Sequence, residues 1–339
     1  MKQSLLAYIS CPLCQEAFSV YVVKQKRDEI EEGTLKCTKC KTEYPVTKGI
    51  PRILPHNVRE SNYSNNFKLY WKSMEWNYSK LYQKRFYEMT GWSNEQVCGK
   101  TILESGCGGG RWVYQFAKEG AKEIVAFDYT EAIDKAKEIC REFDNIHYVQ
   151  ADIFELPFNS NKFDIVHCHG VLHATPDVRE GIKQLADKVK INGELAVLIY
   201  RNLTCIQQLI DDLICFIPKR LPVRLMYYVS IIPTVLEYIP FLTRILENII
   251  HLSAQPNFTL KHLHNFDWYT CTYRQRTSIE EAKEWYKESG FLDLKVMNTN
   301  EFRVQSNIKL LKCLKEWFLQ NGFFLKATLG LRGTKGVQG

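Results

Sequence analysis

The sequence lacks any long uncharged run. No stretch of about 18 residues is free of charged side chains, which excludes a membrane-spanning helix. It also lacks a dense run of basic residues, so it offers no evident nucleic-acid-binding patch. No credible signal peptide is found at its start, so we expect the protein to work in the cytoplasm, with membrane association as an alternative.

The length and composition predict two domains, one small and one large. The chain has 339 residues, of which 45% are apolar, enough for a sizeable core. The net charge of +7 is unevenly distributed, since residues 93–200 are net acidic and the segments on both sides are net basic. The basic surroundings suit anionic lipid, a phosphate-bearing substrate or RNA, and solvated lysines on helix faces are an equally weighted explanation.

Four of the twelve cysteines form two Cys-x2-Cys pairs that 22 residues separate: Cys11, Cys14, Cys37 and Cys40. Two such pairs are the ligand set of a tetrahedral structural zinc, and the residues between them can form a hairpin. Disulfides are the alternative, which the missing signal peptide and eight scattered further cysteines disfavour. We expect a zinc ion that folds this unit of roughly 50 residues, which is too small to be stable by core burial alone.

A glycine loop follows the first apolar strand of the large domain. The strand Thr101–Leu103 leads into Glu104 and then into Gly106, Gly108 and Gly110, and a helix begins near Arg111. Glycines allow positive φ and let a ligand approach the backbone, and ligands of open α/β sheets bind at this edge. Dinucleotides use similar loops, but the acid two residues before the first glycine suits a ligand with an ammonium group, such as S-adenosylmethionine.

Acidic residues also end the next two predicted strands. The strand 122–127 ends in Asp128, which is placed to hold both hydroxyls of a ribose. The strand 146–150 is followed by Asp152, which can accept from an adenine amino group while Ile153 packs on the ring. Further strands are expected at 163–168 and 195–200, the latter after an Asn-Gly turn, and helices at 111–119, 131–143 and 177–190. This alternation predicts a parallel sheet with right-handed crossovers.

Five ordered motifs carry a family resemblance: ILESGCGGG, FDYT, ADIFELPF, FDIVHCHGVLHATPD and INGELAVLIY. Over roughly residues 60–300 the chain resembles class I S-adenosylmethionine-dependent methyltransferases, most of all the branch of the ubiquinone and menaquinone methylases. The resemblance implies an α/β fold with a Rossmann-like, seven-stranded, doubly wound sheet, and it adds Tyr129 and His169 to the expected cofactor contacts. Ala174 stands where the family often has a second His, which puts a His-based catalytic role in doubt.

A second resemblance covers the N-terminal segment. Residues 43–46 (EYPV) and 49–54 (GIPRIL), together with the four cysteines, resemble the small zinc-ribbon domain of the Trm112-like family.

Candidate residues for the acceptor site come from three segments. An aromatic-rich region at 57–99 resembles the family's cofactor cover, and Trp71 or Tyr63 is a candidate wall of the methyl-transfer pocket because sulfonium cations are attracted to aromatic faces. His173 is a candidate general base, and the favoured alternative is that it shapes its loop through hydrogen bonds to the backbone. Asp267 and Tyr269 are candidate pocket residues, and a helix cap is the alternative role of Asp267.

Residues 202–265 are strongly apolar, and four prolines at 218, 222, 233 and 240 divide them into short helices. They predict either a helical cap over a substrate pocket or an interfacial surface whose basic residues meet phosphate headgroups. We favour the cap, which suggests a small-molecule or amphipathic substrate. Peripheral membrane contact through this segment is the alternative.

The predicted organisation is a zinc ribbon at 1–56, an aromatic helical linker or lid at 57–99, a methyltransferase core at 100–201 and 266–339, and the cap at 202–265. The leading hypothesis is an S-adenosylmethionine-dependent methyltransferase that acts on a small or lipid-like molecule. The runner-up is an RNA methyltransferase whose ribbon helps to bind RNA, although the chain has no Asn-Pro-Pro-Tyr-like motif after the fourth strand. The third hypothesis is a non-enzymatic interaction protein that binds the cofactor only for stability.

Overall fold

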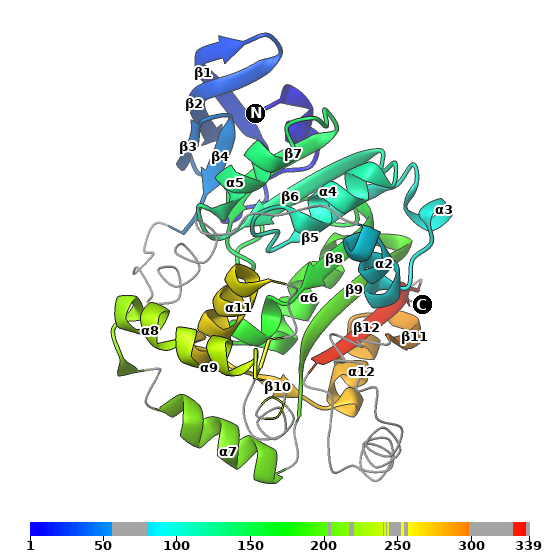
Figure 1. Ribbon diagram of the computed structural model, residues 1–339. Helices are drawn as coiled ribbons and strands as arrows, with labels where there is room; N and C mark the ends of the chain where they lie inside the picture. The colour runs from blue at the N-terminus through cyan, green and yellow to red at the C-terminus, as the bar shows by residue number, and fades with distance from the viewer. Residues whose placement is uncertain are drawn as a thin grey trace.

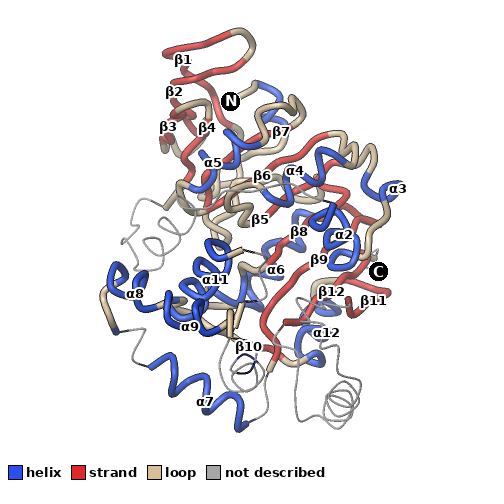
Figure 2. The backbone as a smooth tube through the Cα atoms, in the orientation of Figure 1, coloured by secondary structure: helices blue, strands red, loops and turns tan. Residues whose placement is uncertain are grey.

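The computed structural model describes residues 1–55, 80–202, 205–216, 220–239, 241, 243, 252–253, 257–297 and 328–336. Strands from both ends of the chain join in one continuous sheet, which Figures 1 and 2 show in the same orientation. The lid candidates Trp71 and Tyr63 and the segment 301–327 lie outside the described residues.

The N-terminal segment is an antiparallel β-unit. It comprises η1 (Gln3–Ala7), β1 (Phe18–Lys26), β2 (Glu29–Cys37), β3 (Glu43–Thr47) and β4 (Ile50–Ile53). The expected hairpin between the two cysteine pairs is confirmed, because β1 and β2 pair antiparallel from Phe18–Cys37 to Lys26–Glu29. Along β3 the side chains alternate, with Tyr44 and Val46 buried in the core, as a half-buried strand requires.

The large domain has a mainly parallel sheet. Its strands are β5 (Thr101–Ser105), β6 (Glu123–Asp128), β7 (Ile146–Ala151), β8 (Phe163–His169), β9 (Val189–Arg201), β11 (Phe291–Met297) and β12 (Thr328–Lys335). They follow the order β7-β6-β5-β8-β9-β12-β11, and β12 is antiparallel to both of its neighbours. Strands β5 to β9 are buried along most of their length, because helices cover both faces.

Two hydrophobic cores lie on the two faces of this sheet. The first contains apolar side chains of α6 (Val178–Lys188) and α12 (Ile279–Glu288). The second contains those of α2 (Lys80–Thr90), α4 (Arg111–Lys118) and α5 (Ala132–Ile139). The short α3 (Asn94–Val97) and η2 (Leu172–Ala174) connect strands and helices. The expected doubly wound arrangement is therefore confirmed.

The sheet contains twelve strands, whereas the sequence predicted seven. The difference arises because β4 pairs in parallel with β7, through Arg52–Gln150 and Ile53–Ala151, and so joins the N-terminal unit to the core sheet. The bidentate ion pair of Arg52 with Asp134 on α5, at 2.9 Å for both bonds, reinforces this junction. The short β10 (Arg276–Thr277) adds a further strand beside β9.

The expected Asn-Gly turn before the fifth strand is wrong. Strand β9 runs through Asn192 and Gly193, and its pairing with β8 jumps from Phe163–Val189 to Ile165–Glu194. Asn192 has a φ of +63°, which a β-bulge residue adopts. An Asn-Gly pair supplies positive φ in a bulge as readily as in a turn, so the local pattern cannot distinguish the two.

Among the described residues, four helices lie outside the sheet layers, in the segment predicted as a cap and directly after it. They are α7 (Cys205–Phe216), α8 (Val223–Val229), α9 (Ile231–Leu236) and α11 (Phe258–Thr270). Figure 1 shows α8 and α9 on the side of α11 that faces away from the sheet. Among the described residues, no helix is long and apolar enough to cross a membrane.

Candidate functional site

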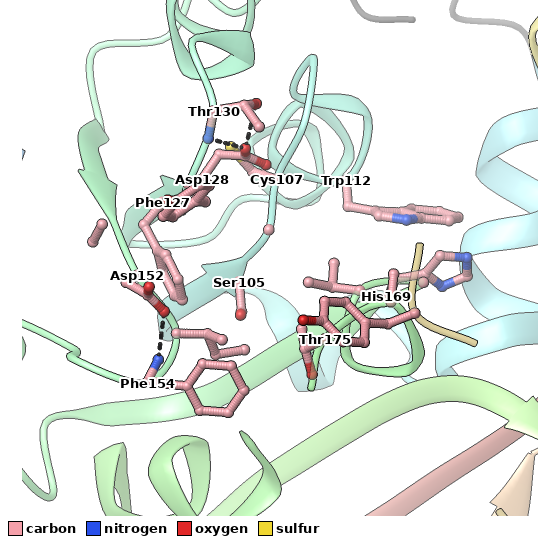
Figure 3. Close-up of a pocket in the computed structure, with 18 of the residues that line it drawn as sticks. Ser105, Cys107, Trp112, Phe127, Asp128, Thr130, Asp152, Phe154, His169 and Thr175 are labelled. Atoms are coloured by element: carbon pink, nitrogen blue, oxygen red, sulfur yellow. Dashed lines mark hydrogen bonds between the residues drawn. The ribbon is translucent and has the colours of Figure 1, made fainter. Parts of the chain in front are cut away.

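A cavity of about 270 Å³ lies at the carboxyl ends of β5, β6, β7 and β8. Its walls come from the loops that follow these four strands, together with Tyr273 from the loop after α11 (Figure 3). The chain leaves β5 in one direction toward β6 and β7, and β8 lies on the other side of β5. The cavity therefore occupies the point where ligands of open α/β sheets bind.

The glycine loop approaches the cavity closely because its glycines adopt left-handed backbone. Gly106 has a φ of +63°, and a Cβ added there would lie 2.3 Å from a methyl group of Val171. Gly110 has a φ of +87° and directly precedes α4, and its added Cβ would lie 3.0 Å from Ala136. Gly106 lines the cavity, whereas Gly108 and Gly110 shape the loop behind it.

The Asp128 carboxylate faces the cavity from the end of β6. Its Oδ1 accepts hydrogen bonds from the Thr130 backbone N–H at 2.8 Å and from the Thr130 hydroxyl at 2.6 Å, and its Oδ2 accepts from the Gly108 N–H at 2.8 Å. A carboxylate has about four lone-pair sites, so Oδ2 retains one for a ligand hydroxyl. Burial raises the pKa of Asp128 above its ordinary value, and the three hydrogen bonds oppose that shift.

Asp152 faces the same cavity from the end of β7, beside Ile153. One of its oxygens accepts from the Phe154 N–H at 2.9 Å, and the other accepts from no described residue. Burial raises the pKa of this carboxyl as well. The side chains of Ile153 and Phe154 supply an apolar wall, so a ring with an amino group at its edge fits this corner.

Glu104 does not line the cavity. Its carboxylate Oε2 lies 2.7 Å from Nδ1 of His167, which is the register partner of Glu104 across β5 and β8, and both side chains are almost fully buried. Burial raises the pKa of Glu104, and the neighbouring His167 opposes that shift. Its other oxygen, Oε1, has no hydrogen-bond partner among the described residues. The sequence pattern predicted a ligand contact and did not indicate this pair.

Aromatic side chains form the side of the cavity next to α4. The rings of Trp112 and His169 have centroids 4.9 Å apart, and both side chains line the cavity (Figure 3). The guanidinium of Arg111 lies 4.4 Å from the centroid of the Trp112 ring. His169 and Tyr129, the two expected cofactor contacts, also line the cavity. Trp112 was missed, although its place in the first turn after the glycine loop was a usable signal.

His173, Asp267 and Tyr269 are not among the residues that line this cavity. The ring of His173 is buried and stacks on Tyr200 at a centroid distance of 3.5 Å, and Tyr200 in turn contacts Trp268. Asp267 lies in the last turn of α11, so its alternative role as a helix cap is wrong; Asn257 caps that helix. Burial raises the pKa of Asp267 to about 7, against the influence of Arg274.

Several lining residues were not among the candidate site residues, although all but Tyr273 lie within the quoted motifs. They are contributed by turns after the strands and by the loop after α11: Thr130, Val171, Thr175 and Tyr273. Tyr273 reaches the cavity because its loop runs beside η2, where the Gln275 N–H donates to the carbonyl of His173 at 2.9 Å. That contact joins residues about a hundred positions apart, which no local pattern indicates.

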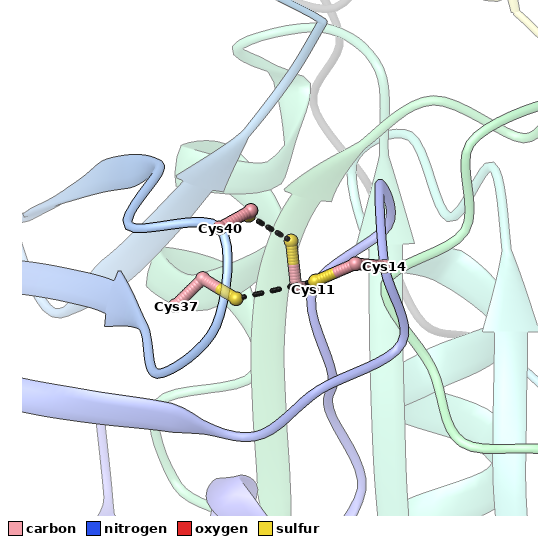
Figure 4. Close-up of side chains that lie close together, drawn as sticks. All are labelled: Cys11, Cys14, Cys37 and Cys40. Carbon is pink, nitrogen blue, oxygen red and sulfur yellow. Dashed lines mark hydrogen bonds between the residues drawn. The ribbon is translucent and has the colours of Figure 1, made fainter.

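The four cysteines converge as their spacing predicted. Their sulfur atoms all lie within 4.8 Å of one another, with 3.6 Å between Cys11 and Cys40 and 3.4 Å between Cys14 and Cys37 (Figure 4). Zn–S bonds of about 2.3 Å place tetrahedral sulfurs about 3.8 Å apart, so the cluster fits zinc. The distances exceed the ~2.05 Å of a disulfide bond, and all four cysteines are free thiols.

Comparisons with known proteins match both parts of the chain. Residues 97–215 match a family model described as a methyltransferase domain, and residues 2–49 match one described as Trm112p-like protein. The chain therefore combines a class I methyltransferase domain with a Trm112-like N-terminal domain that carries a four-cysteine cluster.

Each of two curated relatives matches less than a third of this chain. The ubiquinone biosynthesis O-methyltransferase of Coxiella burnetii is 37% identical over 99 residues, which are 29% of this chain and 42% of that enzyme. A tRNA U34 carboxymethyltransferase of Shewanella halifaxensis is 31% identical over 102 residues, which are 29% of this chain and 31% of that protein. The chain thus spans less than half the length of each of these two relatives.

Among solved structures, a complex that contains the Haloferax volcanii Trm112 methyltransferase activator is similar to this chain. The TM-score is 0.48 at 12% sequence identity, and the match covers 82% of this chain and 99% of that one.

Proposed function

We propose that this chain is a cytoplasmic S-adenosylmethionine-dependent methyltransferase that transfers a methyl group to a small or lipid-like acceptor. The observation that carries the proposal is the pair of carboxylates, Asp128 and Asp152, that end adjacent strands and face one cavity beside a glycine loop. The similarity to methyltransferase domains over residues 97–215 supports it.

The cavity residues suit the parts of this cofactor. Asp128 would accept from the ribose hydroxyls through the free lone pair of Oδ2, and Asp152 would accept from the adenine amino group through its second oxygen. Ile153 and Phe154 would pack on the adenine ring. Gly106 keeps its side of the loop clear, since any side chain there would meet Val171. Trp112 and His169 would border the remaining part of the cofactor.

When bound, S-adenosylmethionine supplies a methyl group that its sulfonium already activates. The chain's own residues then have to align the acceptor with that methyl and exclude water, which accounts for up to roughly 7–11 kcal/mol of the barrier in well-oriented reactions. A general base is needed only for an acceptor that holds its proton at neutral pH. His173, or Asp267 with its raised pKa, would serve such an acceptor.

The acceptor site would lie beside η2 and the end of α11. The stacked rings of His173, Tyr200 and Trp268 make this region aromatic, and Tyr269 is buried next to it. The apolar helices that precede α11 favour an apolar or amphipathic acceptor.

We also propose that Cys11, Cys14, Cys37 and Cys40 bind a structural zinc ion. Four thiolates complete a tetrahedral shell, so the metal would have no open position for catalysis. Its role would be to hold the two cysteine loops of the ribbon together.

RNA methylation is the second candidate function. The similarity of the core to tRNA U34 carboxymethyltransferases favours it, although the match covers only about a third of those proteins. The ribbon would then contact RNA. The two candidates predict different labelled products, so one experiment separates them.

The test is to incubate the purified protein with methyl-labelled S-adenosylmethionine and an extract of host cells, and then to separate lipid, small polar, RNA and protein fractions. We expect label in the lipid or small-molecule fraction. Label in RNA would replace the leading function with the second candidate. If the wild type binds the cofactor but labels no fraction more strongly than the Asp128→Ala variant does, the result would favour a non-enzymatic protein.

A further inference from the structure

The consecutive helices α8 and α9 present apolar side chains to the outside of the molecule. Leu225, Tyr228, Ile232 and Val235 recur at spacings of three and four residues, so they share one face of α8 and α9. Ile239 continues the spacing in the turn after α9. The exposed fractions of all five range from 42% to 67%. We call these five residues the apolar stripe. A stripe of this kind normally faces the core of a water-soluble protein.

The opposite face of the same helices carries buried polar groups. Ser230, Thr234 and the side chain of Glu237 are almost fully enclosed. Asn265 of α11 donates to Oγ1 of Thr234 at 3.1 Å and to a carboxylate oxygen of Glu237 at 2.8 Å, and Lys261 donates to the other oxygen at 2.7 Å. Met226 of α8 also faces inward, in a cluster with Phe266 and Trp268. The apolar stripe is therefore a second apolar surface of these helices, on the side that faces away from α11.

Helix α7 also exposes apolar side chains and buries a polar group. Leu209, Leu213 and Phe216, at spacings of four and three, have exposed fractions of 57% to 64%. On its inner side the carboxylate of Asp211 is almost buried, and it accepts from Arg274 at 2.7 Å and from Nε1 of Trp268 at 3.2 Å. Helix α7 and the segment α8–α9 thus both expose a row of apolar side chains, so the exposed apolar surface does not depend on one residue.

The charges near the apolar stripe are mostly basic on the outside. Arg220 and Arg224 are exposed at the start of α8, and the Arg220 guanidinium lies 3.6 Å from the centroid of the Phe216 ring. The acids Asp211 and Glu237 are turned inward and paired. Asp212 is the exposed acid of α7, 3.6 Å from Arg276. An apolar face with basic residues at its border complements an anionic lipid surface.

We propose that helices α7, α8 and α9 form a docking surface for a membrane that contains anionic lipids. The helices would lie in the interface with the apolar stripe among the acyl chains and the two arginines at the phosphate headgroups. This agrees with the absence of a membrane-spanning helix from the described residues. The surface does not depend on the identity of the methyl acceptor.

The test is co-sedimentation of the full chain with vesicles of phosphatidylcholine and phosphatidylglycerol, compared with vesicles of phosphatidylcholine alone. We expect binding to the mixed vesicles that weakens as salt is added. Val235→Asp should reduce the binding constant about tenfold or more, because it removes an apolar side chain from the stripe. Arg224→Gln should reduce binding to the mixed vesicles about fivefold and leave phosphatidylcholine binding unchanged.

The matched control is Val23→Asp, the same exchange at an exposed valine of β1, far from the stripe. It should bind vesicles as the wild type does, and thermal unfolding should show that both variants are folded. Absence of vesicle binding by the wild type would overturn the proposal, as would an equal loss in both variants. A wild-type dimer that Val235→Asp dissociates, without vesicle binding, would assign the surface to a second copy of the chain.

Discussion

Glu104 and His167 form a buried pair beneath the floor of the cavity, with 2.7 Å between Oε2 and Nδ1. The residues face each other across β5 and β8, and the rings of Trp92, Trp112 and Phe116 surround the imidazole. Trp112 also lines the cavity. The pair thus supports a cavity wall from behind, and the acid of the glycine-loop motif has a positioning role in this structure.

We predict that Glu104→Ala destabilises the protein by about 1–3 kcal/mol, because Nδ1 of the buried His167 loses its hydrogen-bond partner. Glu104→Gln, which keeps the size and a hydrogen bond to His167, should lose much less. Urea unfolding measures both. If Glu104→Ala has the same free energy of unfolding as the wild type but a lower affinity for S-adenosylhomocysteine, then Glu104 binds the ligand and the buried pair contributes little to stability.

The pKa of Asp267 predicts a pH-dependent stability. Burial raises this pKa from 3.8 to about 7 in the folded state, so the folded protein binds a proton that the unfolded chain releases at lower pH. The stabilising contribution is complete below pH ~4 and decreases as the pH rises to about 7. Asp267→Asn should remove this slope, so its stability relative to the wild type should increase between pH 5 and pH 8. Parallel wild-type and variant curves would contradict the raised pKa.

The junction of β4 with β7 predicts that the metal site affects the whole molecule. Cys37→Ser, or a chelator, should unfold the N-terminal unit and release β4 from the edge of the core sheet. We expect a lower midpoint of thermal unfolding and one zinc ion per wild-type chain by elemental analysis. Cys98→Ser, at an exposed free cysteine outside the cluster, is the control and should change neither. A zinc-free wild type of equal stability would contradict the zinc assignment.

Local sequence patterns were sufficient to predict much of the fold and several of the residues at the cavity. Asp128, Asp152 and the glycines were predictable because each follows its own strand, and parallel strands bring their carboxyl ends to one edge. The Glu104–His167 pair was not, because it depends on the register of two strands 63 residues apart. The junction of β4 with β7 was missed for the same reason, since no local pattern indicates which sheet edge a strand joins.

The orientation of side chains outside the cavity could not be predicted without the tertiary structure either. The spacing of the apolar residues in 202–265 predicted helices, but the same period fits a face turned inward or outward. Only the contacts of Thr234 and Glu237 with α11 reveal which side of these helices is buried. Likewise, His173 lies within a motif of the resembling family, yet its ring stacks on Tyr200 and does not line the cavity.

The most direct test of the central claim is calorimetric titration of the protein with S-adenosylhomocysteine, in the wild type and in Asp128→Ala. We predict one site per chain in the wild type and an affinity at least about tenfold lower in the variant, because a ligand hydroxyl loses a hydrogen bond to a charged group. Asp144→Ala, at an exposed aspartate outside the cavity, should bind as the wild type does. Equal affinity in the wild type and Asp128→Ala, with both folded, would contradict the assignment of this cavity as the cofactor site.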